Sequence, residues 1–235
     1  MSIFVLVHGA WGGGWQWRAT ANHLRDCGHE VYAPTLAGMG DRSRLGSKEI
    51  GLTTHIDDVS NLLWFEDLHD VVLVGWSYGA WVVEGVADVM PERLRIVVNL
   101  DGGPVAEGRS LSDGIEADDP IRAWLKRGEA VPPPTEAELA DALEDTVVRH
   151  WAAERERSQP DRAFSEAYPD RGGRRTSVAH VYLACMDQEI DAEGDAHLAR
   201  LRNEGGWEVV EIQLNHLGVL YEPKVVADAL HAIAS

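Results

Sequence analysis

Three runs of apolar residues constrain the fold of this chain more than any other feature of its sequence. Ile3–Val7, Val71–Val74 and Ile96–Leu100 are rich in β-branched residues and contain only one polar side chain, Asn99. Strands that are apolar throughout must be covered on both faces, which is typical of a parallel sheet between two layers of helices. Segments with helical periodicity lie between these runs. The sequence therefore predicts an α/β protein with a mostly parallel, doubly wound sheet.

The other expected elements follow from weaker patterns. Residues 80–90 are apolar almost all round, which predicts a deeply buried helix. Thr53 or Thr54 is expected to cap a helix that ends near residue 67. The remaining predictions are helices at 15–27, at 195–203 and from Pro223 onward, and strands at 30–33, 178–185 and 207–214.

Residues 103–177 interrupt this alternation. They are charged, contain Pro132-Pro133-Pro134 and show no strong strand pattern. A segment of this length is too long for a simple loop, so we expect a short helical lid inserted into one core that is formed by residues 1–102 and 178–235. Thr135 and Glu138 form a capping-box pattern, which predicts a helix running toward Arg155.

Composition excludes several classes of partner. The 235 residues suit a single domain, and 39 acidic against 21 basic side chains give a net charge of −18. Such a chain repels phosphate backbones and anionic lipids, so neither nucleic acid nor a membrane is expected as a partner. No run approaches the roughly 18 apolar residues of a membrane span, and no signal peptide is evident, so we expect a cytoplasmic protein. Cys27 and Cys185 are expected to be buried, reduced thiols.

Gly75-Trp76-Ser77-Tyr78-Gly79 fits the pattern G-x-S-x-G and lies between a predicted buried strand and a predicted buried helix. A sharp turn at this place exposes the serine Oγ at the carboxyl edge of the sheet, and small residues at 75 and 79 permit it. The sequence thus predicts Ser77 as a nucleophile. Main-chain N–H groups of Tyr78 and of Ala10, in the loop after the first strand, are the expected oxyanion donors.

A nucleophilic serine needs a base, and His216 is the best placed of the ten histidines. It follows the last predicted strand, so it should reach the same sheet edge as Ser77. Asp187 is the predicted acid, because it directly follows a strand and gives the chain order Ser, Asp, His. The alternatives are Asp101, which ends another strand, and two neighbours of Asp187, namely Glu189 and Asp191.

Several of these segments together resemble the α/β-hydrolase superfamily. They are Phe4–Trp11, Gly75–Gly79, Met186-Asp187 and Asn215-His216. Within the superfamily they are similar to the branch of salicylate-type methyl esterases, pyrethroid-hydrolase-like carboxylesterases and hydroxynitrile lyases. Gly38–Ser43 and Thr54–Val59 look like the bacterial members. The resemblance implies the α/β-hydrolase fold over nearly the whole chain except the insertion.

Positions around the predicted site favour an esterase within this branch. The lyases carry a threonine where this chain has Gly9, and a lysine where it has Leu217. Trp76 replaces a histidine that is common in these relatives. Trp11 and Trp76 are predicted to form an aromatic wall that binds an apolar substrate, and for Trp76 simple packing is an equal alternative.

The predicted reaction is hydrolysis of a carboxylic ester of a small, apolar or aromatic molecule. Ser77 attacks the carbonyl, His216 takes the proton, Asp187 orients His216, and water releases the acyl group. A lyase-like or other cofactor-free reaction with the same triad, and a non-catalytic small-molecule receptor, are the alternatives.

No cofactor or metal is expected. Trp17 occupies the third glycine position of a G-x-G-x-x-G loop, and Ala192 the turn glycine of a calcium loop. The expected partner is a small-molecule ester, and a homodimer is left open.

Overall fold

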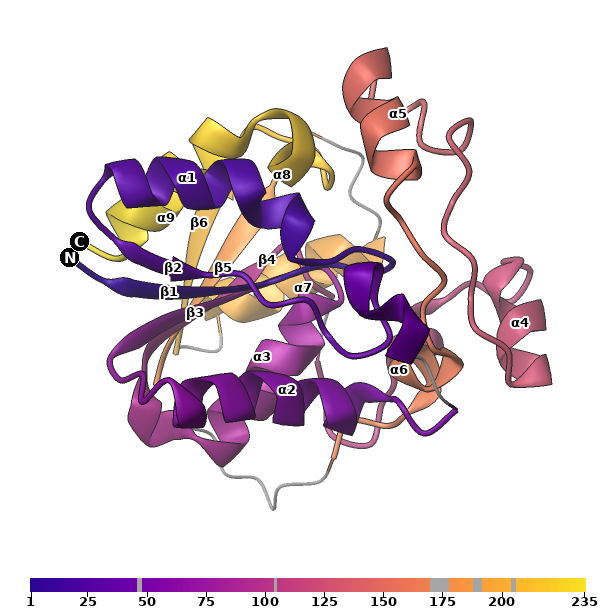
Figure 1. Ribbon diagram of the computed structural model, residues 1–235, viewed down its shortest axis with the longest axis horizontal. Helices are drawn as coiled ribbons and strands as arrows, with labels where there is room; N and C mark the ends of the chain where they lie inside the picture. The colour runs from indigo at the N-terminus through magenta and orange to yellow at the C-terminus, as the bar shows by residue number, and fades with distance from the viewer. Residues whose placement is uncertain (46–47, 104, 170–177, 188–191, 204–205) are drawn as a thin grey trace.

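The computed structural model describes residues 1–45, 48–103, 105–169, 178–187, 192–203 and 206–235. Its centre is a six-stranded sheet with the order β2-β1-β3-β4-β5-β6, in which each neighbouring pair is parallel (Figure 1). The strands are β1 (Ile3–Val7), β2 (Glu30–Tyr32), β3 (Val71–Trp76), β4 (Leu94–Leu100), β5 (Ala179–Cys185) and β6 (Trp207–Ile212).

Helices cover both faces of the sheet. The helices α1 (Arg18–Asp26) and α9 (Pro223–Ile233) pack together on one face, and α2 (Leu52–Phe65) and α3 (Gly79–Val89) on the other (Figure 1). The helix α7 (Ala192–Asn203) lies against β6, and the short α8 (Gly218–Tyr221) precedes α9. None of the helices in the described ranges is long and apolar enough to cross a lipid bilayer.

The uninterrupted apolar character of the central strands follows from this two-sided cover. On β3, Val72 and Val74 enter the core beneath α1 and α9, while Val71 and Leu73 enter the core beneath α2 and α3. All four side chains are fully buried. Because successive strand residues point to opposite faces, a strand with both faces covered has no position for a polar side chain. The predicted doubly wound parallel sheet is confirmed.

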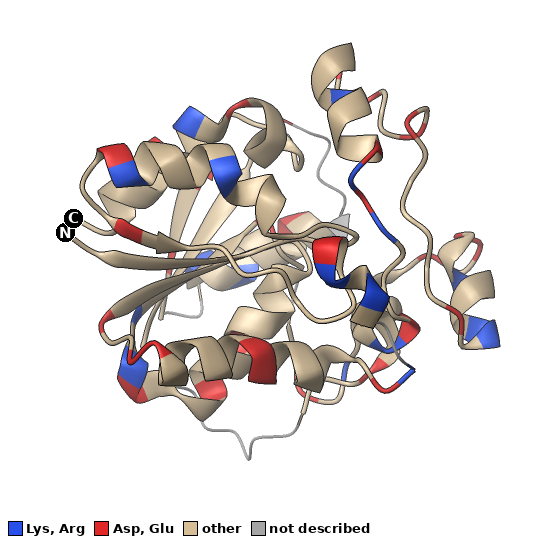
Figure 2. Cartoon of the chain, viewed as in Figure 1, with Lys and Arg blue, Asp and Glu red and all other residues tan. Residues whose placement is uncertain are grey.

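The described part of the insertion between β4 and β5 contains three short α-helices. They are α4 (Ile121–Arg127), α5 (Thr146–Ala153) and α6 (Asp161–Ser165). Figure 1 shows α4 and α5 beside the sheet rather than in its two helical layers. Short 3-10 helices occur at Gly14–Trp17, Gly40–Leu45, Pro91–Arg93 and Leu111–Gly114. Most charged residues lie on the helices and in the insertion, and the strands contain few of them (Figure 2).

Three expectations about local structure are wrong. The capping-box hydrogen bonds of Thr135 and Glu138 are present, but they hold only a series of turns. The helix begins at Thr146, where the Asp145 carboxylate accepts the main-chain N–H groups of the first turn and so provides the stronger cap. Gly51, rather than a threonine, precedes α2. Of the two cysteines, Cys185 is buried as expected, whereas Cys27 is exposed at the end of α1.

Candidate active site

Ser77 occupies a tight turn between β3 and α3. Its φ is +54°, in the left-handed region, and its main-chain N–H donates to the carbonyl of Leu100 at 3.0 Å. A Cβ atom at Gly75 would lie 2.4 Å from the carbonyl oxygen of Gly79, and one at Gly79 would lie 2.6 Å from that of Val7. Only glycine fits at either position. This crowding holds the serine in a conformation that leaves it partly exposed.

The imidazole of His216 lies directly beside this serine. Nε2 of His216 is 3.0 Å from Oγ of Ser77, across 139 residues of sequence. The histidine follows β6, and parallel strands bring their carboxyl ends to one edge of the sheet. The side chain of His216 is 38% exposed, so a small molecule can approach the pair. The distance suits proton transfer from the hydroxyl to the ring.

Asp101, not the predicted Asp187, provides the carboxylate that is hydrogen-bonded to His216. Oδ2 of Asp101 lies 2.7 Å from Nδ1 of His216, and Oδ1 accepts the main-chain N–H of Cys185 at 3.3 Å. The side chain of Asp101 is only 12% exposed. Both ring nitrogens of His216 are therefore hydrogen-bonded, Nε2 with Ser77 and Nδ1 with Asp101. The remaining alternatives, Glu189 and Asp191, lie outside the described residues.

The backbone explains the choice between the two aspartates. Asp101 has a φ of +47° at the end of β4, the strand that pairs with β3. The left-handed turn ends the strand sharply, and its side chain reaches His216. The main-chain N–H of Asp187 donates to the carbonyl of Leu214 at 3.0 Å, as that of Asp101 does to Leu183, but Asp187 lacks the left-handed φ and is exposed. Both residues follow strands, so chain order alone could not separate them.

The loop after β1 lies against the serine turn, where Ala10 was expected to supply an oxyanion donor. A Cβ atom at Gly9 would lie 3.4 Å from Cβ of Ser77, which places the loop at van der Waals distance from the serine. His8 is fully buried beneath the loop. The N–H of Leu36 donates to its Nε2 at 3.1 Å, so Nδ1 carries the proton and donates to the carbonyl of Gly9 at 2.8 Å. This bond fixes the peptide group that carries the N–H of Ala10.

Tyr78, the other expected donor, is anchored by its side chain. The phenol is buried and donates to Nδ1 of His55 at 2.7 Å, and Nε2 of His55 donates to the carbonyl of Ala37 at 2.9 Å. Burial lowers the pKa of His55 and raises that of Tyr78, and burial lowers the pKa of His8 to about 4. Both histidines are therefore neutral at pH 7, and only the main chain of Tyr78 remains for the site.

The side chain of Trp76 is not the substrate wall that the sequence predicted. It is 3% exposed and packs edge-to-face on Trp17. Its indole Nε1 donates to the main-chain carbonyl of His216 at 2.9 Å, and the two rings lie 5.6 Å apart. A side chain with almost no accessible surface cannot line a binding pocket. Trp76 instead supports the loop that carries His216, a role that no pattern in the sequence indicates.

Trp11 joins the core to the insertion. Its indole Nε1 donates to the carbonyl of Val131 at 3.2 Å, and its ring packs at 5.7 Å from Phe164. The insertion also reaches the histidine loop, because the side-chain amide of Asn215 donates to the carbonyl of Ala142 at 2.8 Å. The insertion is thus fastened to loops on both sides of Ser77. Whether Trp11 also contacts substrate stays a prediction.

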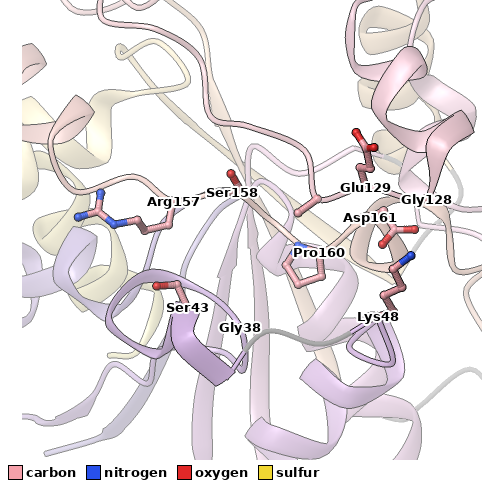
Figure 3. Close-up of a pocket in the computed structure, with 10 residues that line it drawn as sticks. Gly38, Ser43, Lys48, Gly128, Glu129, Arg157, Ser158, Pro160 and Asp161 are labelled. Atoms are coloured by element: carbon pink, nitrogen blue, oxygen red, sulfur yellow. The ribbon is translucent and has the colours of Figure 1, made fainter.

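A cavity of ≈ 590 Å³ lies between the insertion and the segment after β2 (Figure 3). Its charged residues have both signs, with Lys48 and Arg157 opposed by Glu129 and Asp161. The other lining residues are Gly38, Ser43, Gly128, Ala130, Ser158 and Pro160. Ser77 and His216 are not among the residues that line this cavity.

Comparisons with known proteins agree with the fold. The sequence pattern of the alpha/beta hydrolase family matches residues 4–229. A carbendazim hydrolyzing esterase from Nocardioides sp. (strain SG-4G) is 34% identical over 245 residues, which cover 99% of this chain and 100% of the relative. An alpha-hydroxynitrile lyase from Arabidopsis thaliana is 31% identical over 103 residues, covering 42% of this chain and 38% of the lyase.

Solved structures share the same architecture. An extracellular alpha/beta-hydrolase from a Paenibacillus species has a TM-score of 0.80 and 22% identity, covering 100% of this chain and 99% of that one. The chain belongs to the alpha/beta hydrolase family. It is an enzyme of the esterase and hydrolase class, and the family resemblance drawn from its sequence is confirmed.

Proposed function

We propose that this enzyme hydrolyses carboxylic esters of small, apolar or aromatic molecules through Ser77, His216 and Asp101. The observation that carries the proposal is the 3.0 Å contact between Ser77 Oγ and His216 Nε2, with Asp101 2.7 Å from the other ring nitrogen. A neutral imidazole whose Nδ1–H is held by a carboxylate presents its free lone pair to the hydroxyl. It can therefore accept the proton as the oxygen attacks.

The charges that develop in this reaction have matching partners. When Ser77 Oγ bonds to the ester carbonyl, the N–H groups of Ala10 and Tyr78 stabilise the oxyanion and Asp101 stabilises the imidazolium. The protonated His216 then gives its proton to the departing alcohol. In the second half, the same ring takes a proton from water, which attacks the acyl-enzyme and releases the acid and Ser77.

Two positions favour ester hydrolysis over a lyase reaction. A Cβ atom at Gly9 would lie 3.1 Å from the Trp76 ring, so a branched side chain such as the threonine of the lyases meets a crowded site. Leu217, which takes the place of the lyases' lysine, packs against the core under α9 and offers no charge to a cyanide leaving group. Both positions support ester hydrolysis as the proposed reaction, beside the partial match to a hydroxynitrile lyase.

The test combines turnover with labelling of the nucleophile. Wild type and Ser77→Ala are incubated with a panel of aryl and methyl esters, carbendazim and a cyanohydrin, and products are detected by mass. We expect ester hydrolysis that Ser77→Ala abolishes, and labelling of Ser77 by an organophosphonate. Cleavage of the cyanohydrin but of no ester would favour the lyase. Ligand-induced stabilisation with neither turnover nor labelling would indicate a receptor.

A cytoplasmic location and the extent of the lid, residues 103–177, also remain proposals. The loss of strand pattern between β4 and β5 supports the extent of the lid. Limited proteolysis that cuts within 103–177 while the core of residues 1–102 and 178–235 stays associated would support the lid boundaries.

A further inference from the structure

Trp11 adopts a conformation that its side chain disfavours. Its φ is +58°, in the left-handed region that bulky residues rarely occupy. The residue directly follows Ala10, whose N–H is the oxyanion donor from this loop in the proposed function. A left-handed bulky residue costs on the order of 1–3 kcal/mol and persists only where its surroundings hold it. Something in the structure must therefore hold Trp11 in place.

The insertion supplies these restraints. The N–H of Trp11 donates to the side-chain Oε1 of Gln159 at 2.9 Å, and the N–H of Arg157 donates to the carbonyl of Trp11 at 3.0 Å. Gln159 also pairs with Val131 in an antiparallel bridge, with N–O distances of 2.8 and 2.9 Å. Both main-chain groups of Trp11 are thus bonded to one stretch of the insertion. Of these bonds, only that of Gln159 depends on a polar side chain.

We propose that Gln159 is a positioning residue for the oxyanion hole, acting through Trp11. The inference rests on the proposed function and assigns a catalytic effect to a residue of the insertion. Ala10 lies between two peptide groups that are each held by one side chain. His8 holds the carbonyl of Gly9 at 2.8 Å, and Gln159 holds the N–H of Trp11 at 2.9 Å. Because peptide groups are planar, fixing both neighbours fixes the direction of the Ala10 N–H.

The burial of Gln159 fits a positioning role better than contact with substrate. Its side chain is 0% exposed, so no ligand reaches it. Within the described part of the chain, Oε1 is its bonded atom, and Nε2 has no hydrogen-bond partner. A buried amide with one donor group unused is costly, so the bond from its acceptor oxygen to Trp11 must offset that cost. The acceptor oxygen Oε1 is the atom of Gln159 that holds the N–H of Trp11.

The experiment compares Gln159→Met, which keeps the length and removes the acceptor, with Gln159→Glu, which keeps an acceptor oxygen. Ser158→Ala is the matched control, since Ser158 directly precedes Gln159 and lines the cavity of ≈ 590 Å³. An aryl ester that the wild type hydrolyses is the substrate. A trifluoromethyl ketone, which forms a tetrahedral adduct with Ser77, reports on the oxyanion hole. Thermal unfolding shows whether each variant is folded.

We expect Gln159→Met to lower kcat roughly tenfold or more, with KM within about twofold, because the oxyanion forms only after binding. Affinity for the ketone should fall in proportion to kcat. Gln159→Glu should recover most of both values, and Ser158→Ala should match the wild type. If Gln159→Met fails to fold, Gln159→Asn, whose shorter amide cannot reach Trp11, takes its place.

Three results would overturn the inference. The first is an unchanged kcat and ketone affinity in folded Gln159→Met, and the second is a raised KM with kcat unchanged, which would indicate an effect on access alone. The third is a failure of Gln159→Glu to recover activity while it is as stable as the wild type. A wild type that neither hydrolyses esters nor reacts with an organophosphonate would instead refute the proposed function, and the inference with it.

Discussion

Oδ2 of Asp101 and Nδ1 of His216 lie 2.7 Å apart, although 115 residues separate them in the sequence. Asp101 ends β4, beside the strand that carries Ser77, while the sequence had favoured Asp187 at the end of β5. The carboxylate selects the tautomer of His216 that accepts a proton from Ser77. The first prediction follows from this contact.

Asp101→Asn should lower kcat for ester hydrolysis by roughly 10³-fold or more, since an amide neither fixes the reactive tautomer nor stabilises the imidazolium. Asp187→Asn is the matched control and should stay within about twofold of the wild type, because Asp187 is exposed and not bonded to His216. Steady-state kinetics on one aryl ester measure both. A large loss in Asp187→Asn with little effect of Asp101→Asn would show that the carboxylates have exchanged roles.

Trp76→Phe should lower kcat by a factor of about three to ten while the fold is retained. The phenyl ring preserves most of the packing, but the hydrogen bond from Nε1 to the carbonyl of His216, 2.9 Å long, is lost. A single neutral hydrogen bond contributes about 1 kcal/mol, which sets the expected size. The control is Trp64→Phe, an exposed tryptophan at the end of α2. Equal rates in the two variants would mean that the indole does not position His216.

His8 should make the protein less stable as the pH falls below about 6.5. Burial lowers its pKa to about 4 in the folded chain, against about 6.5 for a histidine in the unfolded chain. Between these pH values the unfolded chain binds a proton that the folded chain does not, so stability is lost on acidification and levels off near pH 4. The whole shift corresponds to about 3 kcal/mol.

Urea unfolding at pH 7 and pH 4.5 measures this effect, and His8→Gln provides the comparison. The wild type should lose more stability between the two pH values than His8→Gln does, because glutamine has no proton to gain. Groups distant from His8 contribute equally to both proteins and cancel, whereas His55 interacts electrostatically with His8 in the wild type alone. The same pH dependence in both proteins would argue against a neutral, buried His8.

Gly79→Ala should destabilise the protein by about 2 kcal/mol or more and reduce the yield of active enzyme. The new Cβ atom would lie 2.6 Å from the carbonyl oxygen of Val7, and this main-chain atom cannot move without disturbing β1. Gly114→Ala is the control, because no atom lies within 4 Å of its Cβ position. Thermal unfolding of the two variants compares them directly. Similar melting temperatures would contradict the close approach of β1 to the serine turn.

The architecture was predictable because its signals are local. Fully apolar runs at Ile3–Val7 and Val71–Val74 are typical of a sheet that is covered on both faces. Ser77 lies in a sequence pattern whose two glycines are required, because a Cβ atom at either position would lie less than 3 Å from a main-chain atom. The position of His216 after the last strand was equally accessible, since parallel strands end at one edge. In these cases the residues that carry the sequence signal are close together in the chain.

The insertion was less predictable for the opposite reason. Its helices are short, and the capping box at Thr135 yields only turns before Asp145 caps α5. Segments without a strong apolar period take their conformation from the surface on which they dock. Here that surface includes Trp11 and Asn215, whose partners Val131, Gln159 and Ala142 are far away in the sequence.

The sequence by itself determined the sheet, the serine turn and the edge at which histidine and serine meet. Only the tertiary structure decided that Asp101 rather than Asp187 holds His216, that Trp76 supports the histidine loop, and that Gln159 holds Trp11. The physical reason is that strand order and loop docking set which side chains meet across more than a hundred residues. Hydrogen bonds of about 3 Å depend on those distances, and no local pattern records them.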